Sequence, residues 1–165
     1  PDLPWDARRR RRMCIRDRVR GAPPGLTPTP QQVGGANTWV PMSADSPRDL
    51  LFVPTAAPAP NYWGVHRPGN NDYANSIIAL RGSTGAVVWH FQTLHHDVWD
   101  RDAGSSPILT EMDRGGRKVP AVIQLVKTGM VFAFNRDTGE PLFPIEERPV
   151  PVSYTHLQLP PSELG

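Results

Sequence analysis

The stretch "IIALRGSTGAVVW" at residues 77–89 recurs in altered form as "VFAFNRDTGEPLF" at residues 131–143. Each copy reads apolar-x-Ala-apolar, a few polar residues, Thr-Gly, three more residues and an aromatic residue, and the Thr-Gly pairs lie 54 positions apart. Glycine supplies the left-handed backbone that a tight turn between two strands needs, and the closing aromatic side chain can pack between neighbouring units. A repeat of this length with paired strands predicts the blades of a β-propeller, although two copies also fit a coincidental pair of hairpins.

Short apolar runs bounded by turn residues surround the two copies, and helical periodicity is scarcely visible. The pattern therefore predicts an all-β fold. A turn-rich excursion at residues 57–75 must lie at the surface or line a site, because its Pro, Gly and Asn residues do not continue a strand. The predicted strands are 49–55, 76–81, 86–93, 106–112, 118–126 and 130–135, with a short edge-like run at 141–145.

The composition agrees with short strands and many turns. The chain has 165 residues, enough for one domain, and it combines 20 Pro and 14 Gly with 38% hydrophobic residues. No apolar run is long enough to span a bilayer as a helix. Cys14 is the single cysteine, which excludes an internal disulfide bond and a zinc site built from cysteines.

The two ends of the chain differ in character from its middle. Residues 1–20 hold eight Arg against three Asp, a net charge of +5, so the remaining residues carry −3. The Arg run could contact phosphates, but no aromatic platform or recognition helix accompanies it, so we expect a solvated arm and no nucleic-acid partner. "MCIRDR" (13–18) and "VSYTHLQLPPSELG" (152–165) resemble translated sequencing-adapter read-through. We therefore expect a β-propeller fragment over residues 21–151, with a disordered or artefactual arm at 1–20 and an artefactual tail at 152–165.

Histidines and aspartates gather in "HFQTLHHDVWDRD" at residues 90–102, which continues from a predicted strand. His95, His96 and Asp97 could form a zinc site, because neutral imidazoles are common zinc ligands. Neighbouring side chains of a strand point to opposite faces, however, so both histidines could reach one ion only in a bent loop. The alternative is that the two histidines satisfy backbone groups of the loop and seat Trp99.

The segment Ala-x-x-x-x-Thr-Gly-x-x-x-Trp, from Ala79 to Trp89, resembles the tryptophan-docking motif of quinoprotein dehydrogenases. In that family eight W-shaped, four-stranded blades surround pyrroloquinoline quinone (PQQ). "GGANTW" (34–39) and "VPAVIQLVKTGMVFAFNRDTGEPLFPIEERPVP" (119–151) follow the family in order and spacing, and "HHDVWDRD" (95–102) is similar to the membrane-bound glucose dehydrogenase branch. The resemblance implies a partial eight-bladed β-propeller of two to three blades, and an enzyme fragment that is inactive alone.

The resemblance also implies roles for particular residues. Asp100 stands at the family's catalytic aspartate, the general base that accepts the substrate hydroxyl proton, and it is also expected to bind the metal ion. Lys127 stands 27 residues later, where the family has a cation that stabilises charge on the ortho-quinone oxygens. Trp39 matches the tryptophan beneath the flat cofactor, and Asn37 is expected to reach the cofactor as well.

The implied reaction is oxidation of an aldose sugar such as glucose, or of a related polyol. Hydride would pass to the quinone, polarised by Ca²⁺ or Mg²⁺ as a Lewis acid, and electrons would go on to ubiquinone. Family membership implies catalysis on the periplasmic side of the bacterial inner membrane, with the membrane reached only through a segment absent from this chain.

Two further positions bear on the branch of the family and on the metal. Ala57 stands where that branch has an asparagine metal ligand, which favours the sugar-oxidising branch. Asp102 stands where lanthanide-using relatives have an extra carboxylate, but the glucose branch shares it, so no lanthanide is expected. The alternative function is a non-catalytic propeller scaffold of the outer-membrane assembly type, which has no reason to keep Trp-Asp with a cation 27 residues later.

Overall fold

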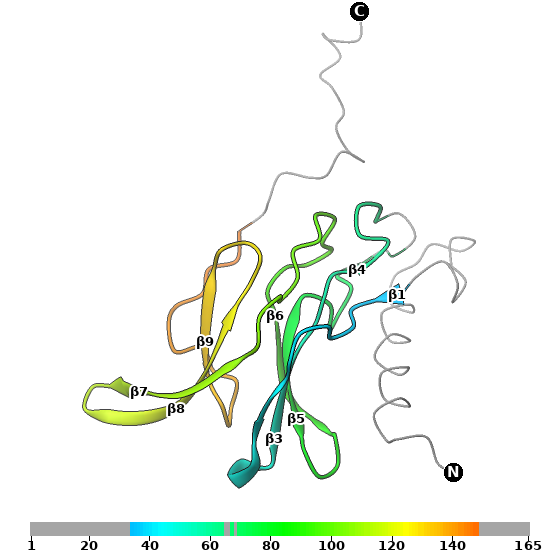
Figure 1. Ribbon diagram of the computed structural model, residues 1–165. Helices are drawn as coiled ribbons and strands as arrows, with labels where there is room; N and C mark the ends of the chain where they lie inside the picture. Colours follow the sequence, from blue (N-terminus) through cyan, green and yellow to red (C-terminus); the bar gives the residue numbers. More distant parts are fainter. Residues whose placement is uncertain (1–33, 65–66, 68, 149–165) are drawn as a thin grey trace, which may run out of the picture.

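The computed structural model describes residues 34–64, 67 and 69–148, and the regular secondary structure of this part is antiparallel strands apart from one short 3-10 turn (Figure 1). The arm at 1–20, the tail at 152–165 and Cys14 lie outside the described residues. No helix in the described ranges is long and apolar enough to cross a membrane. The elements are β1 (Gly34–Gly35), β2 (Ser43–Asp45), the 3-10 turn η1 (Ser46–Arg48), β3 (Leu50–Pro54), β4 (Pro58–Ala59), β5 (Ser76–Arg81), β6 (Val87–Gln92), β7 (Ile108–Arg114), β8 (Arg117–Leu125) and β9 (Val131–Asn135).

Strands β2, β3, β5 and β6 form one four-stranded sheet in which each strand pairs with the next along the chain. This meander is the arrangement that a propeller blade requires, and it confirms the all-β prediction. The sequence patterns missed β2, because Ser43–Asp45 has no alternating apolar pattern and is only three residues long. A β-bulge interrupts the pairing of β5 with β6 between Ala79 and Leu80.

Strands β7, β8 and β9 form a second, three-stranded sheet beside the first. The predicted edge-like run at 141–145 is not a strand. It contributes one isolated bridge, between Phe134 and Pro141. Pro141 and Pro144 have no backbone N–H to donate to a ladder, which explains why the run cannot pair further. A separate pair, β1 with β4, joins the start of the described chain to the long excursion.

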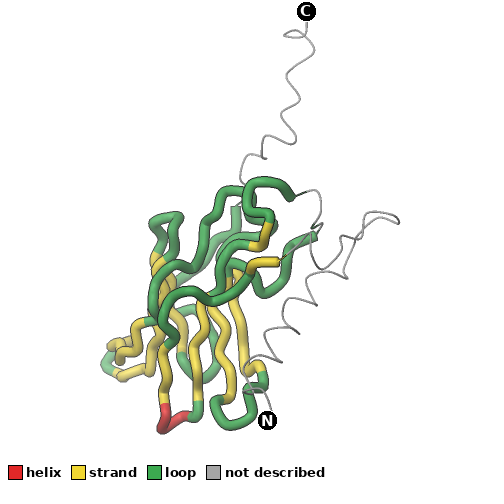
Figure 2. Tube along the Cα trace, turned by 45° about the vertical axis from the view of Figure 1, so that its right-hand side comes forward, coloured by secondary structure: helices red, strands yellow, loops and turns green. Residues whose placement is uncertain are grey.

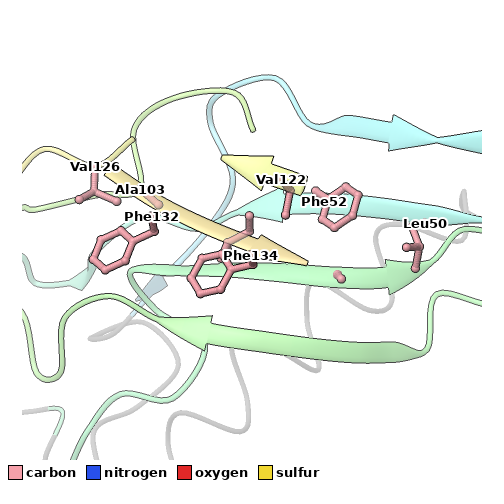
Figure 3. Packing of buried hydrophobic residues seen from close by; sticks show 9 residues of the cluster. Leu50, Phe52, Ala103, Val122, Val126, Phe132 and Phe134 are labelled. Atoms are coloured by element: carbon pink, nitrogen blue, oxygen red, sulfur yellow. The ribbon is translucent and has the colours of Figure 1, made fainter. Parts of the chain in front are cut away.

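The hydrophobic core lies between the two sheets. Register places Phe52, Ala79 and Trp89 side by side across the first sheet. Leu109, Val122 and Phe134 form the matching row across the second. Figure 3 shows side chains of this cluster, with Phe52 and Phe134 both fully buried. The sheets therefore pack face to face through interdigitating apolar rows, as neighbouring blades do.

Trp89, the last residue of the first repeat copy, packs against the second copy. Its ring centroid lies 5.8 Å from that of Phe52 and 5.7 Å from that of Phe134, and its Nε1 donates to the Arg136 carbonyl at 2.9 Å. A Cβ atom on Gly139 would lie 2.6 Å from the Trp89 ring, so only glycine lets the turn approach this closely. The expected packing of the closing aromatic between neighbouring units is therefore confirmed for this copy.

The two Thr-Gly turns make the same backbone hydrogen bonds, 54 residues apart. Gly85 donates to the Arg81 carbonyl as Gly139 donates to that of Asn135, and both glycines have positive φ. Asn135 also accepts from the backbone of its own turn, at Asp137, through Oδ1. The Arg81 side chain has no acceptor atom for this hydrogen bond. The Asp49 carboxylate, at the η1–β3 junction, accepts from the backbone N–H of Ser83 at 2.7 Å instead. The repeat is therefore structural as well as sequential.

Both sheets place their Thr-Gly turns at one end and their longer loops at the other. In the first sheet this loop end is where β3 ends, β5 begins and β6 ends, at residues 54, 76 and 92. In the second sheet the turn at 126–130, which joins β8 to β9, lies at the same end. Figure 2 shows these loops gathered at one end of the strands, with η1 at the opposite end. The residues that the family resemblance singles out all lie in the loops of this gathered end.

Candidate functional site

The loop after β6 is shaped by Asp97, which is almost fully buried. Its carboxylate accepts from the Asn75 side chain at 2.7 Å and from the backbone N–H groups of Trp99 and Arg101 at 2.8 and 2.6 Å. These bonds bend the chain tightly enough that Asp100 takes a left-handed backbone, with φ of 57°. Aspartate tolerates that region better than most residues. In this bend the Asp100 side chain reaches partners in two other loops, Asn61 and Lys127.

Asp100 lies between two donors from different loops. Its Oδ1 accepts from Nδ2 of Asn61 at 2.7 Å, and its Oδ2 accepts from Nζ of Lys127 at 3.2 Å. The side chain keeps 29% of its surface exposed. A carboxylate held by two hydrogen bonds yet open to solvent can still accept a proton from a molecule that binds beside it.

Asp102 is the buried centre of the site, and sequence reasoning did not assign it a role here. Its Oδ1 accepts from the backbone N–H of Ala57 at 2.7 Å. Its Oδ2 accepts from Nζ of Lys127 at 2.6 Å and from Nε1 of Trp39 at 3.2 Å. The available signal was the spacing of two carboxylates, Asp100 and Asp102, ahead of Lys127, because one ammonium group can pair with both.

Trp39 presents a large apolar surface with a fixed edge. Its side chain is 57% exposed, and the Lys127 ammonium lies 5.6 Å from its ring centroid. The hydrogen bond from the indole N–H to Asp102 restricts rotation of the Trp39 side chain, so the ring keeps one orientation. An exposed, tethered indole offers a stacking surface for a planar ligand.

The two carboxylates control the charge of Lys127. The hydrogen bond to Asp102 is the main cause that raises the pKa of Lys127, the bond to Asp100 and the attraction of both carboxylates add to it, and partial burial opposes it. Lys127 is therefore a cation throughout the neutral range; it is 39% exposed, and its Nζ lies over the Trp39 ring, 5.6 Å from the ring centroid.

Asn37 and Ala57 contribute through their backbones. The carbonyl of Asn37 accepts from the N–H of Ala56 at 3.0 Å, and its side chain is exposed. The carbonyl of Ala57 accepts from the N–H of Ala36 at 3.0 Å. These bonds fasten the Trp39 segment to the segment that leaves β3, while the Asn37 side chain is not among the contacts that join Trp39, Asp100 and Lys127.

The two adjacent histidines bind backbone and side-chain groups of neighbouring loops. Nδ1 of His96 lies 2.7 Å from the carbonyl oxygen of Gly69, and its ring occupies the space beside Gly64. His95 lies 3.0 Å from Oε1 of Gln92 and 3.2 Å from Glu147. The partners are those expected of loop histidines, and no group of three or more His, Cys, Asp or Glu within residues 34–64, 67 and 69–148 could hold a metal ion.

A family model described as the β-propeller domain of PQQ-dependent glucose/ethanol/alcohol dehydrogenases matches residues 16–158. This match covers most of the chain. The chain belongs to this family of PQQ-dependent dehydrogenases. Membership agrees with the strand order and with the docked tryptophan, and it favours a dehydrogenase over a scaffold propeller.

Individual relatives agree with the family match. The chain is 44% identical over 117 residues to quinoprotein glucose dehydrogenase A of Acinetobacter calcoaceticus, covering 70% of this chain and 15% of that protein. It is 41% identical over 120 residues to the glycerol dehydrogenase large subunit of Gluconobacter oxydans, covering 72% and 16%. The structure of quinohemoprotein alcohol dehydrogenase from Comamonas testosteroni matches with a TM-score of 0.63 at 29% identity, over 71% of this chain and 18% of that one. The chain thus spans about a sixth of the length of the curated relatives it matches.

The described residues suit part of a PQQ site. PQQ is flat and anionic, so it requires an apolar surface for its face and cations for its edge. The exposed Trp39 ring with the Lys127 ammonium beside it supplies one of each. For a divalent metal the fit is incomplete, because the oxygens of Asp100, like those of Asp102, already accept hydrogen bonds, and the described residues bring no third carboxylate or imidazole to them.

Proposed function

We propose that this chain is a propeller segment of a PQQ-dependent dehydrogenase that oxidises an aldose such as glucose or a related polyol. One observation carries the proposal: Trp39, Asp100 and Lys127 come from three separate loops and meet at one place. The glucose and glycerol dehydrogenases among the relatives support a polyhydroxylated substrate. Ala57, which cannot coordinate a metal through its side chain, supports the sugar-oxidising branch.

In this proposal Asp100 is the general base. Oxidation of an alcohol carbon requires a group that removes the hydroxyl proton, and an aspartate carboxylate at the partly exposed surface can take it. Asn61 and Lys127 hold the two carboxylate oxygens, so the group that accepts the proton is fixed in orientation before substrate binds. The Lys127 ammonium lies 3.2 Å from Oδ2 of Asp100, so the proposed base and the proposed cofactor cation are direct neighbours.

Trp39 and Lys127 are proposed to bind the cofactor. The indole would carry the flat face, with Asn37 as a further contact, and the Lys127 ammonium would lie near the oxygens at its edge. PQQ, when bound, supplies the electron-accepting carbonyl, and Ca²⁺ or Mg²⁺ is proposed as its metal with Asp100 as one ligand. The chain's own residues orient these groups and hold the proton.

The remaining parts of the proposal concern the longer protein. The segment provides one portion of a ring of blades, so we expect the 165-residue chain alone to be inactive. In the longer protein, electrons are proposed to pass to ubiquinone. Catalysis is proposed on the periplasmic side of the bacterial inner membrane, with the membrane reached through a segment outside this chain.

The central test is Asp100→Asn in a full-length protein that carries this segment. The amide keeps the shape of the side chain but is a poor base, so dye-linked glucose oxidation should fall by roughly 10²–10⁴-fold, the usual contribution of a positioned base. Binding of PQQ, measured by equilibrium dialysis of the apoprotein, should persist. Asp113→Asn, a turn aspartate in the β7–β8 hairpin, is the matched control and should leave oxidation unchanged. Turnover retained in Asp100→Asn would remove Asp100 from the role of base.

A further inference from the structure

The two oxygens of the buried Asp102 carboxylate serve different partners. Oδ1 accepts from a backbone group, the N–H of Ala57, and so fastens the loop after β6 to the segment after β3. Oδ2 accepts from two side chains, Lys127 at 2.6 Å and Trp39 at 3.2 Å. Asp102 is only 4% exposed, so these bonds replace hydration that the carboxylate has lost.

The Oδ2 bonds hold two side chains that are both exposed, and the Lys127 ammonium has one further carboxylate partner, Asp100, at the longer distance of 3.2 Å. Trp39 is more than half exposed, and Lys127 has a long, flexible stem at the surface. An exposed indole and an exposed ammonium would ordinarily sample several rotamers. One shared acceptor sets both of them, and it therefore fixes the position of the cation relative to the plane of the ring.

Lys127 forms ion pairs with two carboxylates, and Asp102 is the nearer of them. The ammonium lies 2.6 Å from Asp102 and 3.2 Å from Asp100, so the shorter bond goes to the buried group. Without the Asp102 side chain as a partner, Lys127 would be free to pair more closely with Oδ2 of Asp100 and to cover that oxygen. The buried carboxylate thus keeps the exposed one accessible.

We propose that Asp102 is a positioning residue of the cofactor site, which sets the Trp39 ring and the Lys127 ammonium in one fixed arrangement and holds Lys127 back from Asp100. The proposal rests on the proposed function, since it assumes that Trp39 and Lys127 bind PQQ. Asp102 itself touches neither substrate nor cofactor. Its effect is pre-organisation, which lowers the ordering cost when the flat ligand binds.

The first experiment is Asp102→Asn in the full-length apoprotein, with PQQ affinity measured by equilibrium dialysis so that the readout does not depend on turnover. The amide oxygen can still accept from Ala57, but its NH₂ group would face two donors, Lys127 and Trp39. PQQ should bind roughly 10- to 100-fold more weakly, the range typical for loss of a group that orients a ligand. Affinity equal to that of the wild type would overturn the proposal.

Asp45→Asn is the matched control. Asp45 is 5% exposed and pairs with Arg136 at 2.6 Å, as Asp102 pairs with Lys127, but it joins β2 to the turn after β9 at the opposite end of the sheets. Both substitutions should lower the melting temperature. Only Asp102→Asn should weaken PQQ binding in samples that are folded by circular dichroism. Equal weakening in both would show that Asp102 acts through general stability, against the proposal.

A double-mutant cycle with Lys127→Met tests whether Asp102 acts through the lysine. If it does, the double variant should bind PQQ within about threefold of Lys127→Met alone, because the two substitutions remove the same interaction. Fully additive losses would contradict the proposal. Trp39→Phe keeps an aromatic ring but removes the N–H together with part of the stacking area, so it tests the other arm even if Asp102→Asn fails to fold. It should bind PQQ roughly 3- to 10-fold more weakly, and unchanged affinity would remove Trp39 from the proposal.

The outcomes separate this inference from the proposed function. A wild-type protein that binds no PQQ would refute the proposed function itself. A wild type that binds PQQ and oxidises glucose, with an Asp102→Asn variant of equal affinity, would refute only the positioning role.

Discussion

The two ends of the strands follow different rules. At one end the turns at 81–86 and 135–140 repeat the same hydrogen bonds with the same offset. At the other end no loop resembles another: the excursion after β3, the loop after β6 and the short turn after β8 differ in length and in sequence. All proposed site residues lie at the irregular end. The comparison indicates that the repeated turns belong to the scaffold of this molecule and that the proposed site lies where the repetition stops.

Within the repeating end, the two closing aromatics differ in surroundings. Trp89 packs between Phe52 and Phe134. Phe143, at the equivalent place in the second copy, is 51% exposed and has Arg114 over its ring at 4.9 Å. An aromatic residue at this motif position therefore contributes little to stability unless a further blade packs over it.

The largest expected effect tests this difference directly. Trp89→Ala should lower the free energy of unfolding of the 165-residue chain by about 3 kcal/mol, because it empties the space between the sheets. Phe143→Ala should cost less than about 1 kcal/mol, as expected for an exposed ring. Urea denaturation followed by circular dichroism measures both. In a complete propeller the two losses of unfolding free energy should become similar. Equal losses in the 165-residue chain would contradict the different packing of Trp89 and Phe143.

A smaller effect is expected at the turn glycines. Gly139→Ala should cost about 2 kcal/mol, since the new Cβ combines a strained positive φ with a clash against Trp89. Gly116→Ala, in the β7–β8 hairpin, has a similar φ of 79° but nothing within 4 Å of the new atom. It should cost about 1 kcal/mol, from backbone strain alone. The difference between the two losses of unfolding free energy measures the cost of the clash with Trp89. A difference near zero would mean that the Trp89 ring moves aside without a loss of stability.

The smallest expected effect lies at the irregular end. Asn61→Ala removes the donor to Oδ1 of Asp100, so the base should be less well oriented and kcat for glucose in the full-length protein should fall about tenfold, equivalent to about 1.4 kcal/mol. The unfolding free energy should change little. Asn70→Ala, at an exposed position of the same excursion, is the control. A loss of stability in Asn61→Ala without any loss of kcat would place Asn61 in the scaffold instead.

The sequence predicted the regular end well and the irregular end only in part. Apolar runs located β3, β5 and β6, and the Thr-Gly pair located both turns. The sequence did not indicate that Asp49 caps the first turn in place of Arg81, because that substitution reaches across 34 residues. The same limitation applies to Asp102, whose partner Trp39 lies 63 residues away. Local patterns do not specify such distant pairs, and only the packing of the two sheets creates them.

The meander of the first sheet also determines the sequence of events during synthesis. Its strands are consecutive, so this blade can form as soon as Gln92 has left the ribosome. Trp39 must then wait for Asp102, and both must wait a further 25 residues for Lys127. A nascent chain halted between those points would carry a finished blade without the Trp39–Asp102–Lys127 contacts, so the proposed site forms later than the sheet that supports it.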